Sequence, residues 1–181
     1  IYGYKFSGYW GYTRTVREFW NANMDLLGDN PLIDMESWGV RTNLEHRGVR
    51  YNQPALIGSD ADVSNSQIYN GCVIEGTVKN SILFPGVHVG PGSLVEDSVI
   101  FFSNVIGKNC VLKKLISDVN TGYGDNVELG LQCNDNTKEI AVVGWNNKVP
   151  PGTKIGCGVT VPPFLDQEKW PKVVESGRVL G

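Results

Sequence analysis

Residues 79–95, 96–112 and 113–129 read KNSILFPGVHVGPGSLV, EDSVIFFSNVIGKNCVL and KKLISDVNTGYGDNVEL, so the chain repeats itself with a period of 17 residues. A mainly apolar position recurs at steps of six within each copy and five between copies: Leu83, Val89, Val95, Ile100, Ile106, Leu112, Ser117, Tyr123 and Leu129. A helix would space apolar residues by three and four, and an amphipathic strand would alternate them. The six-residue period instead predicts an all-β fold, a left-handed parallel β-helix whose short strands stack into coils. Its left-handed winding is an exception to the usual crossover rule.

The six-residue step extends beyond the three copies. It joins Ile57 to Val63 and Ile68 to Ile74, and it continues from Val143 to Val161. Glycine often follows the apolar position, and we interpret this as the corner where the backbone turns. The glycines concerned are Gly58, Gly90, Gly107, Gly124, Gly144 and Gly156.

Three segments follow from these patterns. Residues 1–30 are expected to hold one strand, over the alternating aromatics of residues 1–10, and one amphipathic helix capped by Thr13 or Thr15. Residues 31–53 are an irregular connector. Residues 54–181 are the β-helix, interrupted by a polar excursion at 130–139 and closed by a C-terminal cap with a helical turn and a hairpin near residues 175–177.

Composition excludes several classes of function. The net charge of −3 provides no basic stripe for nucleic acid. No apolar run approaches the roughly 18 residues of a membrane span, so we expect no membrane partner and a cytoplasmic protein. The cysteines are far apart, which indicates neither a zinc ribbon nor a redox pair, and Cys72, Cys110 and Cys157 fall within hexads as small apolar residues. Because Ile1 leads directly into ordered-looking sequence, we expect a piece of a longer protein.

The sequence offers no self-sufficient active site, so we expect no catalytic residues, no metal site and no cofactor in this chain. Hexapeptide solenoids include acyltransferases that use a histidine as general base, but the only histidines are His46 and His88. His88 adjoins the column residue Val89 and should point outward. Two histidines cannot supply a three-histidine zinc site unless subunits share them.

A cluster of cations is the best candidate for a ligand site. Guanidinium groups match the geometry of phosphate, so these residues are candidates for binding a phosphorylated effector. The alternative is an ordinary solvated surface. The residues are Arg41, His46, Arg47, Arg50, Lys113 and Lys114.

Several runs resemble the C-terminal part of ADP-glucose pyrophosphorylase, glucose-1-phosphate adenylyltransferase. They are residues 4–27 (YKFSGYWGYTRTVREFWNANMDLL), 38–42 (WGVRT), 53–55 (QPA) and 66–101, in which NGCVIEGT at 70–77 followed by Asn80-Ser81 is the most specific. The resemblance implies a parent enzyme that transfers an adenylyl group from ATP to glucose 1-phosphate with Mg²⁺. It also implies a homo- or hetero-oligomer, a tetramer in the family, in which the β-helix supports assembly and allosteric control. The catalytic domain would then lie mostly outside this chain.

One position departs from the family pattern. Where the family has Trp-x-Asp-Val-Gly-Thr, this chain has WGYTRT at residues 10–15, so Tyr12 replaces an acidic residue. In related sugar nucleotidyltransferases that carboxylate lies at the magnesium and sugar-phosphate site, and a phenol is a poor ligand for Mg²⁺. We therefore hypothesise a weakened or noncatalytic, regulatory-type homologue.

Two alternatives stay open: a fragment of another sugar-1-phosphate nucleotidyltransferase, such as a mannose 1-phosphate guanylyltransferase, or a free-standing hexapeptide acyltransferase. Assembly is expected on physical grounds as well, because open strand edges and outward aliphatic residues such as Val99 and Val105 favour a partner.

Overall fold

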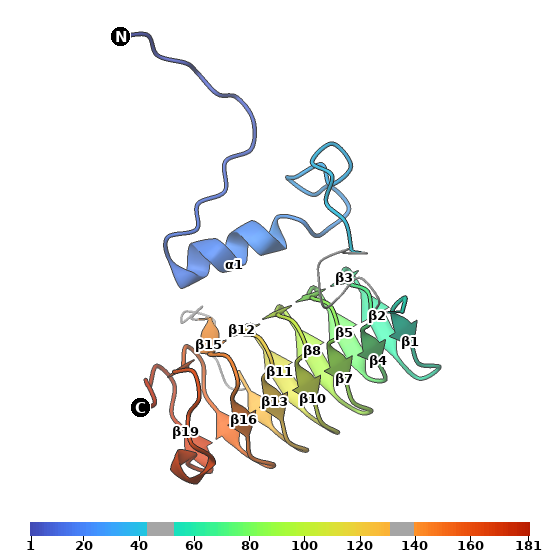
Figure 1. Cartoon of the computed structure of the whole chain (residues 1–181), viewed down its shortest axis with the longest axis vertical. Coiled ribbons are helices and arrows are strands. Elements are labelled where there is room, and N and C mark those ends of the chain that lie inside the picture. Colours follow the sequence, from blue (N-terminus) through green and yellow to red (C-terminus); the bar gives the residue numbers. More distant parts are fainter. Residues whose placement is uncertain (43–52, 131–139) are drawn as a thin grey trace.

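The computed structural model describes residues 1–42, 53–130 and 140–181. Residues 53–130 and 140–181 form a left-handed parallel β-helix of three sheets, and one helix, α1 (Val16–Met24), lies along one side (Figure 1). His46, Arg47, Arg50 and most of the polar excursion at 130–139 lie outside the described residues.

The three sheets form the sides of a prism, and every pairing between neighbouring strands is parallel. Sheet A contains β1 (Leu56–Ile57), β4 (Val73–Ile74), β7 (His88–Val89), β10 (Val105–Ile106), β13 (Gly122–Tyr123) and β16 (Lys148–Val149). Sheet B contains β2 (Asp62–Ser64), β5 (Thr77–Lys79), β8 (Leu94–Glu96), β11 (Val111–Lys113), β14 (Glu128–Leu129), β17 (Lys154–Ile155) and β19 (Val173–Val174). Sheet C contains β3 (Gln67–Ile68), β6 (Ile82–Leu83), β9 (Val99–Ile100), β12 (Leu115–Ser117), β15 (Ala141–Val143) and β18 (Thr160–Val161).

The predicted columns are the core. Val89 pairs with Ile106 and Ile106 pairs with Tyr123 on successive coils, as the 17-residue period requires. Val95, Leu112 and Leu129 stack in the same way in sheet B. Their side chains are almost completely buried, so each coil contributes one apolar side chain per face to a continuous interior.

The column includes one polar exception. The Tyr123 hydroxyl lies 2.7 Å from Ser117 Oγ, which donates to Asn104 Oδ1 at 2.6 Å. Ser117 is small, and it lies across the prism from the larger Tyr123. Because every hydroxyl has a partner, the interior tolerates this pair.

The glycines at the corners are required for a different reason from the one predicted. A Cβ on Gly90 would lie 2.6 Å from the carbonyl oxygen of Gly107 on the next coil, and one on Gly124 would lie 2.7 Å from Pro151. Close approach between coils therefore excludes a side chain at these corners. The left-handed backbone is found elsewhere, notably at Asn65 and Asn80, whose side chains hydrogen-bond to each other at 2.7 Å.

Helix α1 forms where the sequence predicts it, and Thr15 is its cap. Thr15 Oγ1 accepts from the Glu18 amide while the Glu18 carboxylate accepts from Thr15 N, which completes a capping box. The helix packs on the outer face of sheet C, against a cluster of Val99, Ile116 and Ile140. The expectation that Val99 is available to a partner is therefore wrong, because this residue is fully buried beneath the helix.

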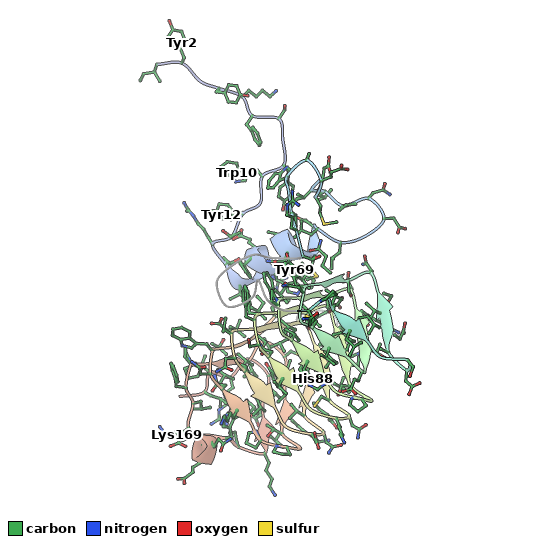
Figure 2. All side chains as sticks on the ribbon, turned by 45° about the vertical axis from the view of Figure 1, so that its right-hand side comes forward. Tyr2, Trp10, Tyr12, Tyr69, His88 and Lys169 are labelled. Atoms are coloured by element: carbon green, nitrogen blue, oxygen red, sulfur yellow. The ribbon has the colours of Figure 1, made fainter. Side chains whose placement is uncertain are left out.

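The expected strand over residues 1–10 does not form within the described part of the chain. These residues run away from the β-helix as an extended segment, with Tyr2 and Trp10 largely exposed (Figure 2). No described strand lies beside this segment, and a strand needs a neighbour for its backbone hydrogen bonds. Tyr9 anchors this segment, because its hydroxyl donates to Asp25 at 2.7 Å and its ring lies edge-on to Trp38.

The C-terminal cap has the expected helical turn, a 3₁₀ helix at Gln167–Lys169. The expected hairpin is wrong, because β19 pairs in parallel with β17 and Val179 bridges in parallel to Thr160. Residues 175–177 are thus one more corner of the coil rather than a reversal of the chain.

Candidate functional site

The predicted cations that the structure describes do not form one cluster. Arg41, Lys113 and Lys114 are described, and each lies in different surroundings. The structure therefore does not support a single anion pocket made from these three residues.

Lys113 is engaged in an ion pair. It lies on the outer face of sheet B, where its Nζ is 2.7 Å from Glu96 Oε2. Two similar pairs occupy the same face, Lys79 with Asp62 at 3.5 Å and Lys154 with Glu128 at 3.1 Å. This face carries opposite charges on neighbouring strands, which leaves Lys113 a poor candidate for an effector site.

Lys114 has another cation beside it. It lies at the corner between β11 and β12, with a φ of 50°, and borders a hollow of about 250 Å³ next to helix α1. The other lining residues are Arg17, Trp20, Asn21 and Ile140. Sequence reasoning missed Arg17, because only the packing of the helix on sheet C brings it to this corner.

Arg41 lines a separate hollow of about 450 Å³. Its neighbours there include Glu36, Gly39 and Gln67, and no lining residue is shared with the Lys114 hollow. The carboxylate of Glu36 makes this hollow less favourable for an anion than the one that holds Arg17 and Lys114.

A third hollow, of about 660 Å³, has an identifiable origin in the sequence. The step from Ile74 to Val78 is four residues instead of six, so the second coil has a shorter corner than its neighbours. The hollow lies over this short corner, between the longer corners of the first and third coils. Asp60 and Lys79 both line it, so its charge is mixed.

His88 lies outward on sheet A, as predicted (Figure 2). Its Nε2 is 2.9 Å from Glu75 Oε2, which gives it the partner that the sequence could not identify. A single exposed His–Glu pair is not an acyltransferase site, because such a site also needs a groove that binds the acyl donor.

The buried thiols have structural roles. Cys72 and Cys110 lie in the interior, and burial raises the pKa of both thiols. A protonated, enclosed thiol is a weak nucleophile. This confirms that Cys72 and Cys110 serve as small apolar residues.

The surroundings of Tyr12 do not fit a magnesium site. The Arg14 guanidinium carbon lies 5.3 Å from the centre of the Tyr12 ring, and a cation at this place disfavours a second one. Among residues 1–42, 53–130 and 140–181, no three His, Cys, Asp or Glu side chains are grouped to hold a metal ion. No helix in the same ranges is long and apolar enough to cross a membrane.

Comparison with known proteins gives consistent relatives. The family model described as "GlmU-like, C-terminal hexapeptide" matches residues 55–143. A glucose-1-phosphate adenylyltransferase of Acetivibrio thermocellus is 33% identical over 98% of this chain, and one of Desulforamulus reducens is 38% identical over 86%. A Bacillus mycoides protein with the same name is 43% identical over 64% of the chain.

The match is confined to part of each relative. The chain spans 43% of the Acetivibrio protein, 39% of the Desulforamulus protein and 30% of the Bacillus protein. The matched part is their C-terminal part. These relatives are named adenylyltransferases, so they favour neither the guanylyltransferase nor the acyltransferase alternative.

Proposed function

We propose, on the premise that this chain is homologous to the C-terminal, hexapeptide-repeat part of the glucose-1-phosphate adenylyltransferases, that it serves assembly and regulation in such an enzyme. The reaction of such an enzyme is the transfer of an adenylyl group from ATP to glucose 1-phosphate with Mg²⁺, and most of the residues for it would lie outside this chain. ATP and sugar phosphates are cytoplasmic metabolites, so the proposal places the protein in the cytoplasm.

One observation carries the proposal: helix α1 is fixed to the β-helix. Trp20 Nε1 donates to the Asp97 carbonyl at 2.8 Å, and Phe19 stacks on Phe101 with ring centres 6.3 Å apart. At the other end of the helix, the Gly28 amide donates to Asn65 Oδ1 at 2.7 Å. Because α1 precedes the β-helix in the chain, such a fixed helix can pass a displacement from the coils to the segment before it.

The hollow between Arg17 and Lys114 is the proposed effector site. It is bounded by the helix on one side and by a corner of the β-helix on the other. An anion held by both cations would bind more tightly when the helix is docked, so effector binding and helix position are coupled. The effector class is a phosphorylated metabolite, because a guanidinium and an ammonium together suit phosphate oxygens.

The test is a calorimetric titration of the chain with inorganic phosphate and with a sugar bisphosphate. We expect saturable binding that Lys114→Ala or Arg17→Ala weakens at least tenfold. Lys113→Ala is the matched control, since its ammonium is paired with Glu96. Equal binding by Lys114→Ala and Lys113→Ala would contradict the site.

The parent is proposed to be a weakened or noncatalytic, regulatory-type homologue. The observation behind this is Tyr12, a phenol next to Arg14 where the family has a carboxylate. Restoring Tyr12→Asp in the full-length protein should raise ATP–pyrophosphate exchange. A wild-type protein that already runs at the rate of its catalytic relatives would refute this part of the proposal.

A further inference from the structure

The outer face of sheet A carries exposed aliphatic side chains. Six outward side chains follow one another up the stack, one from each strand: Leu56, Val73, His88, Val105, Gly122 and Lys148. The exposed fraction is 62% for Leu56 and 52% for Val105. Sheet C is covered by α1. Sheet B also has outward aliphatic residues, Leu94, Val111 and Val173, but three Lys–carboxylate ion pairs lie on the same face, so it is more highly charged than sheet A.

The six positions are complementary when the column of one copy faces the column of a second copy running in the opposite direction. The first, Leu56, lies opposite Lys148, whose aliphatic stem can cover it. The second, Val73, lies opposite Gly122, where an added Cβ would meet nothing within 4 Å. The third, His88, lies opposite Val105. Each pairing sets a larger side chain against a smaller or flexible one.

We propose that sheet A binds the sheet A of a second copy of this chain, about a twofold axis that runs along the strands between β7 and β10. This inference rests on the assembly role proposed above and names its surface. Strand spacing is the same in both copies, so the register holds over all six coils.

A twofold axis along the stack is the other way to pair two such faces, and it fits worse. That axis would set each residue against its own copy. Lys148 would meet Lys148, which is repulsive, and Gly122 would meet Gly122, which leaves a void. The reversed arrangement avoids both.

Charge also favours the reversed arrangement. Asp60, in the corner after β1, and Lys148, on β16, make no ion pair with a residue in the described ranges. Reversal brings the last coil of one copy to the first coil of the other, so Lys148 approaches Asp60 of the second copy. His88 keeps Glu75 as its partner.

The area of the face determines how tightly the two copies can bind. Six coils at about 4.8 Å and roughly six residues per side at about 3.3 Å give a face of about 24 by 20 Å. Two such faces bury on the order of 1,000 Å², which is the lower end of specific interfaces. The dimer should therefore be weak and depend on concentration in the micromolar range.

The first experiment is sedimentation velocity of the chain over a hundredfold range of concentration. Val105→Glu should weaken the dimer more than tenfold. Val173→Glu is the matched control, because Val173 is also an exposed valine on a strand but belongs to sheet B. Circular dichroism confirms that both variants keep the β-helix.

Four further variants test the direction of the axis. Lys148→Glu should weaken the dimer and Asp60→Lys added to it should restore it. A chain with Leu56→Cys and Lys148→Cys should form an intermolecular disulfide, and Leu56→Cys alone should not. Cross-linking of Leu56→Cys to itself would overturn the reversed arrangement.

The outcomes separate this inference from the proposed function. An oligomer that Val105→Glu leaves unchanged overturns the sheet A interface while assembly stands. A strict monomer at every concentration overturns both the interface and the assembly role. Dimer loss in Val105→Glu with retention in Val173→Glu supports both.

Discussion

Sheet C and sheet A are built from the same kind of short parallel strand, yet their outer faces differ. On sheet C the outward Val99 is fully buried under α1, whereas on sheet A the outward Val105 is half exposed. The inward residues of both sheets are alike, so the β-helix itself does not distinguish them. Inward positions determine the fold, and outward positions determine what each face of the prism can bind.

The largest expected difference in stability is between a charge introduced on the outer face of sheet C and one introduced on the outer face of sheet A. Val99→Asp places a carboxylate beneath the helix without a partner, and it should lower the free energy of unfolding by more than about 3 kcal/mol. In the monomer, at low protein concentration, Val105→Asp should change it by less than about 0.5 kcal/mol, because the side chain remains in water. Urea denaturation of both variants measures this, and equal losses would show that the two faces do not differ.

Removing the helix contact should have a smaller effect. Trp20→Ala deletes half-buried packing and the bond to the Asp97 carbonyl, and it should cost about 2 kcal/mol. Trp20→Phe keeps most of the packing and should cost about 1 kcal/mol. Hydrogen exchange should show faster exchange in α1 and little change in the coils. Unchanged protection of α1 in Trp20→Ala would mean that the helix is held by other contacts.

The buried Tyr123 hydroxyl should make the stability of the fold depend on pH in the alkaline range. Burial raises the pKa of Tyr123 above its ordinary value of 10.0. Above pH 10 the unfolded chain loses this proton while the folded chain keeps it, so stability is full below pH 10 and falls as the pH rises, by at most about 1.4 kcal/mol per unit. Tyr123→Phe should reduce this slope without abolishing it, because the pKa values of Tyr9 and Tyr69 are raised as well. Tyr2→Phe, in the exposed segment, should leave the slope unchanged. A slope in Tyr123→Phe as steep as that of the wild type would assign it to the other groups.

The smallest effect is expected on sheet B. Lys113→Ala removes one partly exposed ion pair, so the free energy of unfolding should fall by less than about 1 kcal/mol. The difference should shrink as salt is added. Thermal melts at low and high ionic strength measure it, and a loss that does not respond to salt would point to packing of the lysine stem instead.

The coils could be predicted from the sequence because their period is local. Every residue of the 17-residue column takes its predicted place, including the polar Ser117 and Tyr123, although their hydrogen bond was not predicted. Val99 was predicted to point outward, and it does. That α1 covers it depends on packing between residues about 80 positions apart, which a periodic pattern does not record.

The candidate ligand site was less predictable. Lys114 was selected as one of a group of cationic residues that could bind an anion, but Arg17 reaches it only through the docking of a helix. Lys113 was chosen with it, and its ion pair with Glu96 depends on strand register. The expected strand at residues 1–10 shows a related limit. Alternating aromatic residues indicate a preference for the strand conformation, but they do not show whether a neighbouring strand is present to pair with it.

The short corner of the second coil bears on how this chain can change in length. It has two residues fewer than its neighbours, yet β4 and β5 pair in register on both sides. Between β14 and β15 the chain instead gains residues, and β15 still pairs in register with β12. Corners therefore accept deletions and insertions while the ladders stay intact. A fluorescent tag or an affinity peptide inserted after Gly76 should leave the coil stack undisturbed.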